Sequence, residues 1–147
     1  MCLTCDVVNK KVVPAGGILY QDDLVILHQC LDVNIPGYFI VSPIRHVEEY
    51  SSLTDSEIFR MSLAARSVVQ ILHELNDVEK VYILNFAEET AHFHWHLFPR
   101  YTWMVTQNTE HIYTGNRLDG AKLFSFYREK CKAQLADMDK SDILKTI

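Results

Sequence analysis

Apolar residues in the first third of the chain fall into short segments separated by turn-forming residues. Residues 18–20 and 24–27 flank the polar residues 21–23, which predicts a hairpin of two strands. Residues 38–42 follow a turn that contains Pro36 and Gly37, and they are rich in aromatic and β-branched side chains, as in a third strand. Residues 81–86 and 92–98 predict a second hairpin around the polar loop 87–91. We therefore expect about five strands.

The middle of the chain predicts one long helix. Thr54 and Glu57 have the spacing of a capping box, in which each side chain hydrogen-bonds the backbone N–H of the other residue. Apolar residues then recur every three or four positions, at Ile58, Met61, Ala65, Val68, Leu72 and Leu75. A last helix, capped by Asp119 or Asn116, is expected near the C-terminus. Hairpins with one inserted helix indicate an α+β domain on an antiparallel sheet.

Composition narrows the class of protein. The 147 residues are 48% hydrophobic and contain no repeat or linker-like stretch, so residues 1–147 are expected to form a single domain. A net charge of -5 argues against a nucleic-acid partner, which needs a basic face, but leaves room for a small phosphorylated ligand. The chain has no long apolar run and no signal-peptide pattern. We expect a soluble, cytoplasmic protein without a membrane partner.

Three histidines carry the chemistry that the sequence suggests. His92, His94 and His96 occupy alternate positions, so a strand would project all three from one face at intervals of about 6 to 7 Å. Buried imidazoles need hydrogen-bond partners, so three of them are an unfavourable way to fill a core. They could bind one catalytic zinc with an open coordination position, or one imidazole could attack a phosphate. The spacing alone does not separate these interpretations.

The surrounding residues resemble a known family. Residues 92–98 follow the order His, apolar, His, apolar, His, apolar, apolar, the motif that names the histidine-triad (HIT) family. Residues 20–23, 36–41 and 43–46 are similar to the family's N-terminal landmarks, and Asn85 also matches. The resemblance covers about residues 2–100 and leaves the C-terminal third unexplained. It implies a HIT-like antiparallel sheet of about five strands, one long central helix and a C-terminal helix.

The resemblance also implies a function. In a two-step reaction, His94 would attack the α-phosphorus of a nucleotide and water would then release it, while His96 would stabilise the leaving group and Asn85 would give polar support. Substrates would be nucleotide phosphoanhydrides, phosphoramidates or dinucleoside polyphosphates. Alternatives are a nucleotidyltransferase on the same scaffold, or a nucleotide-binding module with little turnover. The family's usual assembly implies a homodimer.

A zinc site is implied by the same resemblance. Family members that begin with Cys-x-x-Cys look like zinc proteins, and the corresponding residues here are Cys2, Cys5, His46 and His92. Two cysteines and two histidines form a closed, structural set of ligands, which would leave His94 and His96 free of metal. The alternative is that the two cysteines bind no metal.

Several positions depart from the family pattern. The aspartate that holds the ribose is replaced by Cys30, and Asp32 could serve instead. The usual glycine- and serine-rich stretch before the triad is replaced by residues 87–91, where Thr90 could bind phosphate while Glu88 and Glu89 would repel it. Tyr38 replaces a histidine of the family pattern. Arg100 is either a ligand for outer phosphates or a surface residue, and Tyr101 and Trp103 form either a base-stacking wall or part of the core. The remaining histidines, His28, His73 and His111, are expected on the surface or on a helix.

Overall fold

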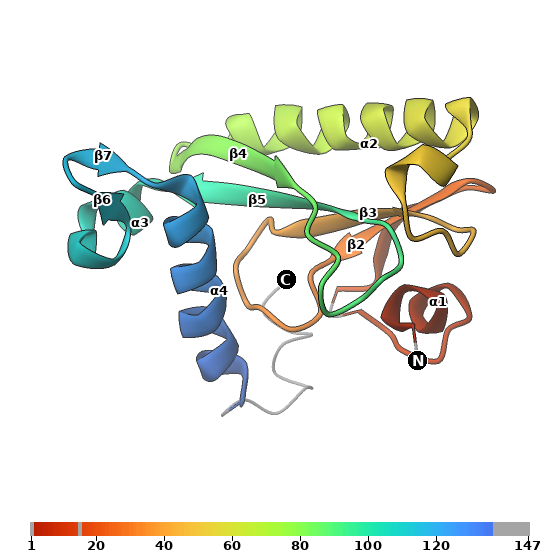
Figure 1. Ribbon diagram of the computed structural model, residues 1–147, viewed down its shortest axis with the longest axis horizontal. Helices are drawn as coiled ribbons and strands as arrows, with labels where there is room; N and C mark the ends of the chain where they lie inside the picture. Colours follow the sequence, from red (N-terminus) through yellow and green to blue (C-terminus); the bar gives the residue numbers. More distant parts are fainter. Residues whose placement is uncertain (1, 15, 137–147) are drawn as a thin grey trace.

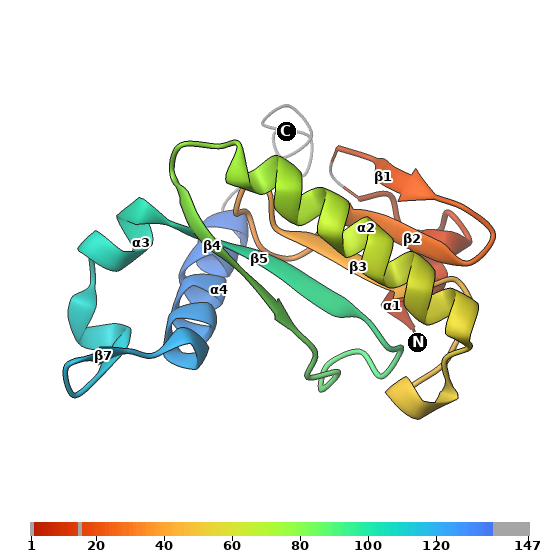
Figure 2. The same ribbon diagram turned by 90° about the horizontal axis from the view of Figure 1, so that it is seen from above.

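One antiparallel sheet lies between helices on both of its faces (Figures 1 and 2). The structure, a computed structural model, describes residues 2–14 and 16–136, with the backbone alone for residues 133–136. The sheet has the order β1-β2-β3-β5-β4, from β1 (Ile18–Gln21), β2 (Val25–Gln29), β3 (Phe39–Pro43), β4 (Val78–Leu84) and β5 (Trp95–Tyr101). Helix α2 (Asp55–His73) covers one face, while α1 (Leu3–Val8) and α4 (Gly120–Ala136) lie on the other. The α+β class and the five-stranded sheet are confirmed.

Smaller elements complete the fold. They are a short α3 (Thr102–Thr106), two 3-10 turns at Tyr50–Ser52 and Thr109–His111, and a two-stranded ribbon of β6 (Tyr113–Thr114) and β7 (Arg117–Leu118). The sequence pattern did not predict these elements. Among the described residues, no helix is long and apolar enough to cross a membrane.

The prediction for α2 is confirmed in detail. Thr54 and Glu57 form both bonds of the capping box, and Glu57 is buried beside Arg45, whose guanidinium lies 2.8 Å from the carboxylate. Met61, Ala65, Val68 and Leu72 are buried toward the sheet. Leu75 does not continue this apolar stripe, because the helix ends before it and its side chain is exposed.

The boundaries of the last hairpin were predicted wrongly. Strand β4 begins at Val78 rather than residue 81, and β5 begins at Trp95 rather than His92. The loop between them is therefore longer than residues 87–91, and Ala87 within it has a positive φ that is incompatible with an extended strand. Because His92 and His94 precede β5, the alternation of a strand does not fix their directions. The expectation that all three histidines share one face of a strand is wrong for His92.

Sheet register explains how a polar surface forms opposite α2. His28 in β2 lies beside Ile40 in β3, which in turn lies beside His96 in β5. Side chains of paired residues share a face, so these three residues project away from α2. Helix α4 crosses this face, with Phe124 packed edge-on against Phe98 and His96. Asp119 caps α4 by accepting a hydrogen bond from the backbone of Lys122, as one of the two predicted caps.

Candidate active site and metal cluster

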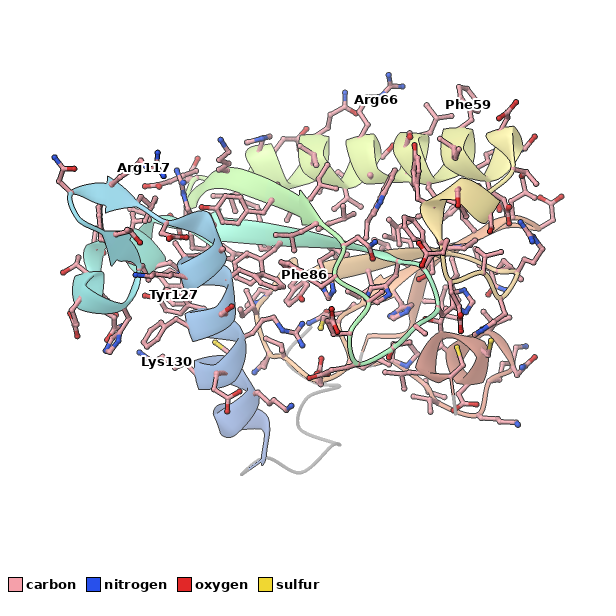
Figure 3. All side chains as sticks on the ribbon, viewed as in Figure 1. Phe59, Arg66, Phe86, Arg117, Tyr127 and Lys130 are labelled. Carbon is pink, nitrogen blue, oxygen red and sulfur yellow. The ribbon has the colours of Figure 1, made fainter. Side chains whose placement is uncertain are left out.

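A pocket of about 340 Å³ opens on the side of the sheet that α4 crosses. Its walls come from α1, β2 and the loop after it, the loop before β5, and α4. Phe86, labelled in Figure 3, belongs to the loop before β5 and lines the pocket, while Phe59 and Arg66 point outward from α2 on the opposite side of the molecule. The polar residues that line the pocket are Thr4, His28, Cys30, Asp32, Glu88, Glu89, Thr90, His94, His96, Ser125 and Arg128.

His94 and His96 meet inside this pocket. The Nε2 atoms of the two rings are 3.1 Å apart, and Nδ1 of His94 lies 2.7 Å from the carbonyl oxygen of His92. A carbonyl only accepts, so Nδ1 of His94 carries the proton and donates it. Neutral His94 therefore has a lone pair on Nε2, the nitrogen that faces the pocket.

Burial keeps both rings uncharged near neutral pH. It lowers the pKa of His94 below its ordinary value, although the hydrogen bond to the His92 carbonyl acts in the opposite direction. Burial, the neighbouring His94 ring and the charge of Arg128 lower the pKa of His96 to about 3. A neutral imidazole with a free nitrogen is a competent nucleophile.

Tyr38 connects His96 to Arg128, which lines the pocket. The Tyr38 hydroxyl lies 2.5 Å from Nδ1 of His96, and the Arg128 guanidinium lies 2.5 Å from the same hydroxyl oxygen. Arg128 also lies 3.3 Å from a carboxylate oxygen of Asp32. Gly37 supports this arrangement, since it has a φ of +80° and a Cβ there would lie 2.6 Å from Leu72 Cδ2.

A second cluster forms where α1 meets the end of β3. Cys2 caps the helix and Cys5 lies one turn on, so the two sulfur atoms lie on the same side. The Cys2 sulfur is 3.4 Å from Nδ1 of His92, and the Cys5 sulfur is 3.4 Å from Nδ1 of His46 and 3.6 Å from Nδ1 of His92. All four ligand atoms lie within 4.8 Å of one another. The structure thus brings together the residues named from the sequence.

The geometry of this cluster fits zinc. A tetrahedral zinc with ordinary zinc–sulfur and zinc–nitrogen bonds separates its ligand atoms by about 3.3 to 3.8 Å, and the three sulfur–nitrogen distances of 3.4, 3.4 and 3.6 Å agree with this. The outer nitrogens of the rings have partners as well. Nε2 of His92 lies 2.8 Å from the Pro43 carbonyl, and Nε2 of His46 lies 3.6 Å from a Glu48 carboxylate oxygen. Such partners fix the orientation of metal-binding histidines.

The other residues named from the sequence divide into two groups. Asp32 and Thr90 line the pocket, as do Glu88 and Glu89, whose charges disfavour a phosphate there. Asn85 is exposed after β4 and Arg100 pairs with Glu79, and neither residue lines the pocket. Tyr101 is buried and stacks on Trp103 away from the pocket, so both belong to the packing of the domain.

Two pocket residues were missed or misplaced by the sequence analysis. His28 was expected on the surface or on a helix, but it is 3% exposed in β2 and lines the pocket. Arg128 was not singled out, because it lies in the part of the chain that the family resemblance leaves unexplained. Its spacing of four from Phe124 places both on one face of α4, but no local signal says which face meets the sheet.

Comparison with known proteins agrees with this geometry. The sequence model of the HIT domain matches residues 11–103, more than half of the chain. An uncharacterized HIT-like protein of Methanocaldococcus jannaschii is 26% identical over 106 residues, which are 69% of this chain and 80% of the relative. Among solved structures, a HIT family hydrolase from Clostridium thermocellum has a TM-score of 0.54 at 17% identity and covers 67% of this chain and 90% of its own.

A Zn-bound histidine triad family protein from Mycobacterium smegmatis has a TM-score of 0.59 at 16% identity, covering 94% of this chain and 97% of its own. At such identities the structural matches show a shared fold. The match to the HIT domain model is a sequence match, and it includes the histidine triad. The chain therefore belongs to the HIT family.

Proposed function

We propose that this protein is a nucleotide hydrolase that acts through a covalent nucleotidyl group on His94. The observation that carries the proposal is the fixed orientation of this ring. Its Nδ1 donates to the His92 carbonyl, so the lone pair of Nε2 is directed into the pocket, next to His96. This is the arrangement that an imidazole nucleophile requires.

The reaction has two steps. In the first step a bond forms between Nε2 of His94 and the α-phosphorus, and the bond from phosphorus to the leaving group breaks. In the second step water attacks the same phosphorus and the bond from phosphorus to Nε2 breaks, which restores His94. The attacking water releases one proton, which replaces the proton that the leaving group takes up in the first step. His96 lies next to the reacting atoms and stabilises charge as it develops on the leaving group.

Substrate contacts are proposed for two lining residues. Thr90 offers a hydroxyl to a phosphate oxygen, and Asp32 offers a carboxylate to the ribose in place of the residue that Cys30 replaces. Arg100 is engaged by Glu79 outside the pocket and has no role in the proposal.

A structural zinc is proposed for Cys2, Cys5, His46 and His92. When bound, it would tie the N-terminal segment to the centre of the domain and stabilise the fold, without taking part in the reaction. Free thiols as metal ligands are consistent with the cytoplasmic location expected from the sequence.

We also propose a homodimer. Strand β4 is an edge of the sheet, and the exposed apolar side chains of Ile83 on β4 and Ile71 on α2 lie on one surface beside it. An apolar surface next to a free strand edge suits association with a second copy. Light scattering after gel filtration tests this, and Ile83→Lys is expected to shift the mass to that of one chain.

Trapping the intermediate tests the catalytic proposal. The protein is mixed with adenosine 5′-phosphoramidate or a dinucleoside polyphosphate, quenched early, and examined by intact mass, with zinc measured in parallel. We expect a mass increase of one nucleotidyl group that is absent in His94→Ala, while the zinc content is unchanged. Absence of both adduct and turnover would support a binding module, and loss of zinc in His94→Ala would support a zinc hydrolase.

The transferase alternative needs a separate experiment. The same reaction is run with a phosphorylated acceptor in excess. Transfer of the nucleotidyl group to the acceptor faster than to water would favour nucleotidyltransferase activity.

A further inference from the structure

Three hydrogen bonds connect helix α4 to the reacting histidines. Arg128 contacts the Tyr38 oxygen, Tyr38 contacts Nδ1 of His96, and Nε2 of His96 contacts Nε2 of His94. Arg128 lies outside residues 11–103, the segment that matches the HIT domain. We propose that Tyr38 and Arg128 are positioning residues that hold the single proton of His96 on Nε2, where it is donated to the leaving group; this rests on the proposed function.

The direction of the chain follows from what each group can donate. A guanidinium has only donors, so the Tyr38 oxygen accepts from Arg128. The hydroxyl proton of Tyr38 is then directed to Nδ1 of His96, 2.5 Å away. A neutral imidazole that accepts at Nδ1 carries its proton on Nε2.

The opposite end of the chain gives the same assignment independently. His94 donates through Nδ1 to the His92 carbonyl and has a lone pair on Nε2. Its Nε2 is 3.1 Å from Nε2 of His96, and a hydrogen bond between two nitrogens needs one proton. That proton must come from His96. The two ends of the chain therefore select the same tautomer.

This tautomer matters for catalysis. When a nucleotide displaces the contact between the two rings, His94 keeps its lone pair for phosphorus and His96 turns its N–H toward the leaving atom. The other tautomer would present a lone pair to atoms that become negative as the bond breaks. A donor aimed at developing charge stabilises the transition state more than the ground state.

The surroundings hold Arg128 and Tyr38 in place. The Tyr38 side chain is fully buried, and the Arg128 side chain is 20% exposed. The guanidinium carbon lies 5.5 Å above the Phe124 ring, and Asp32 binds its other end. Among the described residues that line the pocket, Arg128 is the one arginine or lysine. Without it, the Tyr38 hydroxyl is free to rotate and to accept from His96 instead.

The test compares leaving groups. Adenosine 5′-monophosphate is joined either to 4-nitrophenol, which departs as a stable anion, or to propylamine, whose nitrogen must gain a proton as its bond to phosphorus breaks. For Tyr38→Phe and Arg128→Gln we expect kcat on the propylamine substrate to fall about 100-fold, as for loss of one transition-state donor. The nitrophenyl substrate should lose no more than about fivefold. Arg128→Lys should recover part of the loss, and the neighbouring Glu129→Gln should match the wild type.

Equal losses on both substrates would overturn the proposal, because a merely structural change does not distinguish leaving groups. The tautomer is measured directly from the ring nitrogen chemical shifts of His96. Wild-type protein should show the proton on Nε2, and Tyr38→Phe should show a mixture. A proton on Nδ1 in the wild type would also overturn the proposal. Absence of turnover by the wild type with the Nε2 proton in place would count against the proposed function alone.

Discussion

His92 and His94 are two residues apart, yet they serve different regions of the molecule. His92 places Nε2 on the Pro43 carbonyl and so leaves Nδ1 for the two cysteines. His94 places Nδ1 on the His92 carbonyl and so leaves Nε2 for the pocket. In both cases a backbone carbonyl occupies one nitrogen and thereby decides which nitrogen is free. The motif supplies the rings, and the local backbone assigns their roles.

The two regions also differ in how completely their groups are partnered. In the cysteine–histidine cluster, four ligand atoms face one another, so the set is closed. The pocket is open, and one buried polar atom of its lining, Nε2 of His28, lacks a partner within the described chain. A closed set suits a structural metal, and unsatisfied groups suit a site that binds a ligand.

The largest expected effect separates the two regions by metal content and stability. Cys5→Ala should lose zinc, and the free energy of unfolding should fall by about 3 kcal/mol or more, because a metal clip that joins distant segments is lost. His96→Asn in the pocket should keep the metal. Metal analysis and urea unfolding measure both quantities, and Cys131→Ala controls for loss of a buried thiol elsewhere. One zinc per chain retained in Cys5→Ala would contradict the assignment.

The second effect is the pH dependence of the free energy of unfolding that Asp22 causes, away from both regions. Burial raises the pKa of Asp22, but hydrogen bonds from Val25, Leu24, Tyr20 and Arg60 outweigh it and lower the pKa from 3.8 to about 2. The folded value is the lower one, so the stabilisation is present above the unfolded pKa and is lost as the pH falls through the folded pKa. The shift corresponds to about 2 kcal/mol.

Unfolding by urea at about pH 5 and about pH 2.5 checks this expectation. The wild type should lose stability between these values, and Asp22→Asn should lose less, while its zinc content at neutral pH stays unchanged. An equal loss in both proteins would show that Asp22 does not account for the acid dependence.

The third effect tests whether a polar group that serves binding in the pocket lowers the free energy of unfolding. His28 donates through Nδ1 to the Gln29 carbonyl, which leaves Nε2 as a buried acceptor without a partner. His28→Leu removes this cost, so the free energy of unfolding should rise by about 1 kcal/mol while kcat/KM falls. Thermal unfolding and steady-state kinetics measure the two changes. A variant that loses stability would indicate that Nε2 is already satisfied.

The smallest expected effect concerns charge in the pocket. Neutralising Glu88 and Glu89, both of which line it, should raise kcat/KM for a dinucleoside polyphosphate by about two- to fivefold at low salt, with a smaller gain at high salt. Glu74→Gln at the end of α2, outside this pocket, is the matched control. An unchanged kcat/KM would mean that the two carboxylates do not face the substrate.

Local physics made much of the fold predictable. The capping box and the apolar periodicity determine α2. The strands of the first hairpin and β3 were predicted from short apolar segments that follow turns. The start of β5 was predicted less well. Alternation suggested a strand from residue 92, but the backbone of Phe93 bonds to Val47 in a loop, a contact that no local pattern encodes.

Taken by itself, the sequence determined the α+β class, the long helix and the triad, because these follow from periodicity, capping and a motif of adjacent residues. The four residues of the cysteine–histidine cluster come from distant parts of the chain and were named from the resemblance to the HIT family. Tertiary structure alone decided that His28 and Arg128 face the pocket while Asn85 and Arg100 do not. Those outcomes depend on strand register and on the face that α4 turns to the sheet. Both result from packing between residues far apart in the chain, such as Phe124 against Phe98.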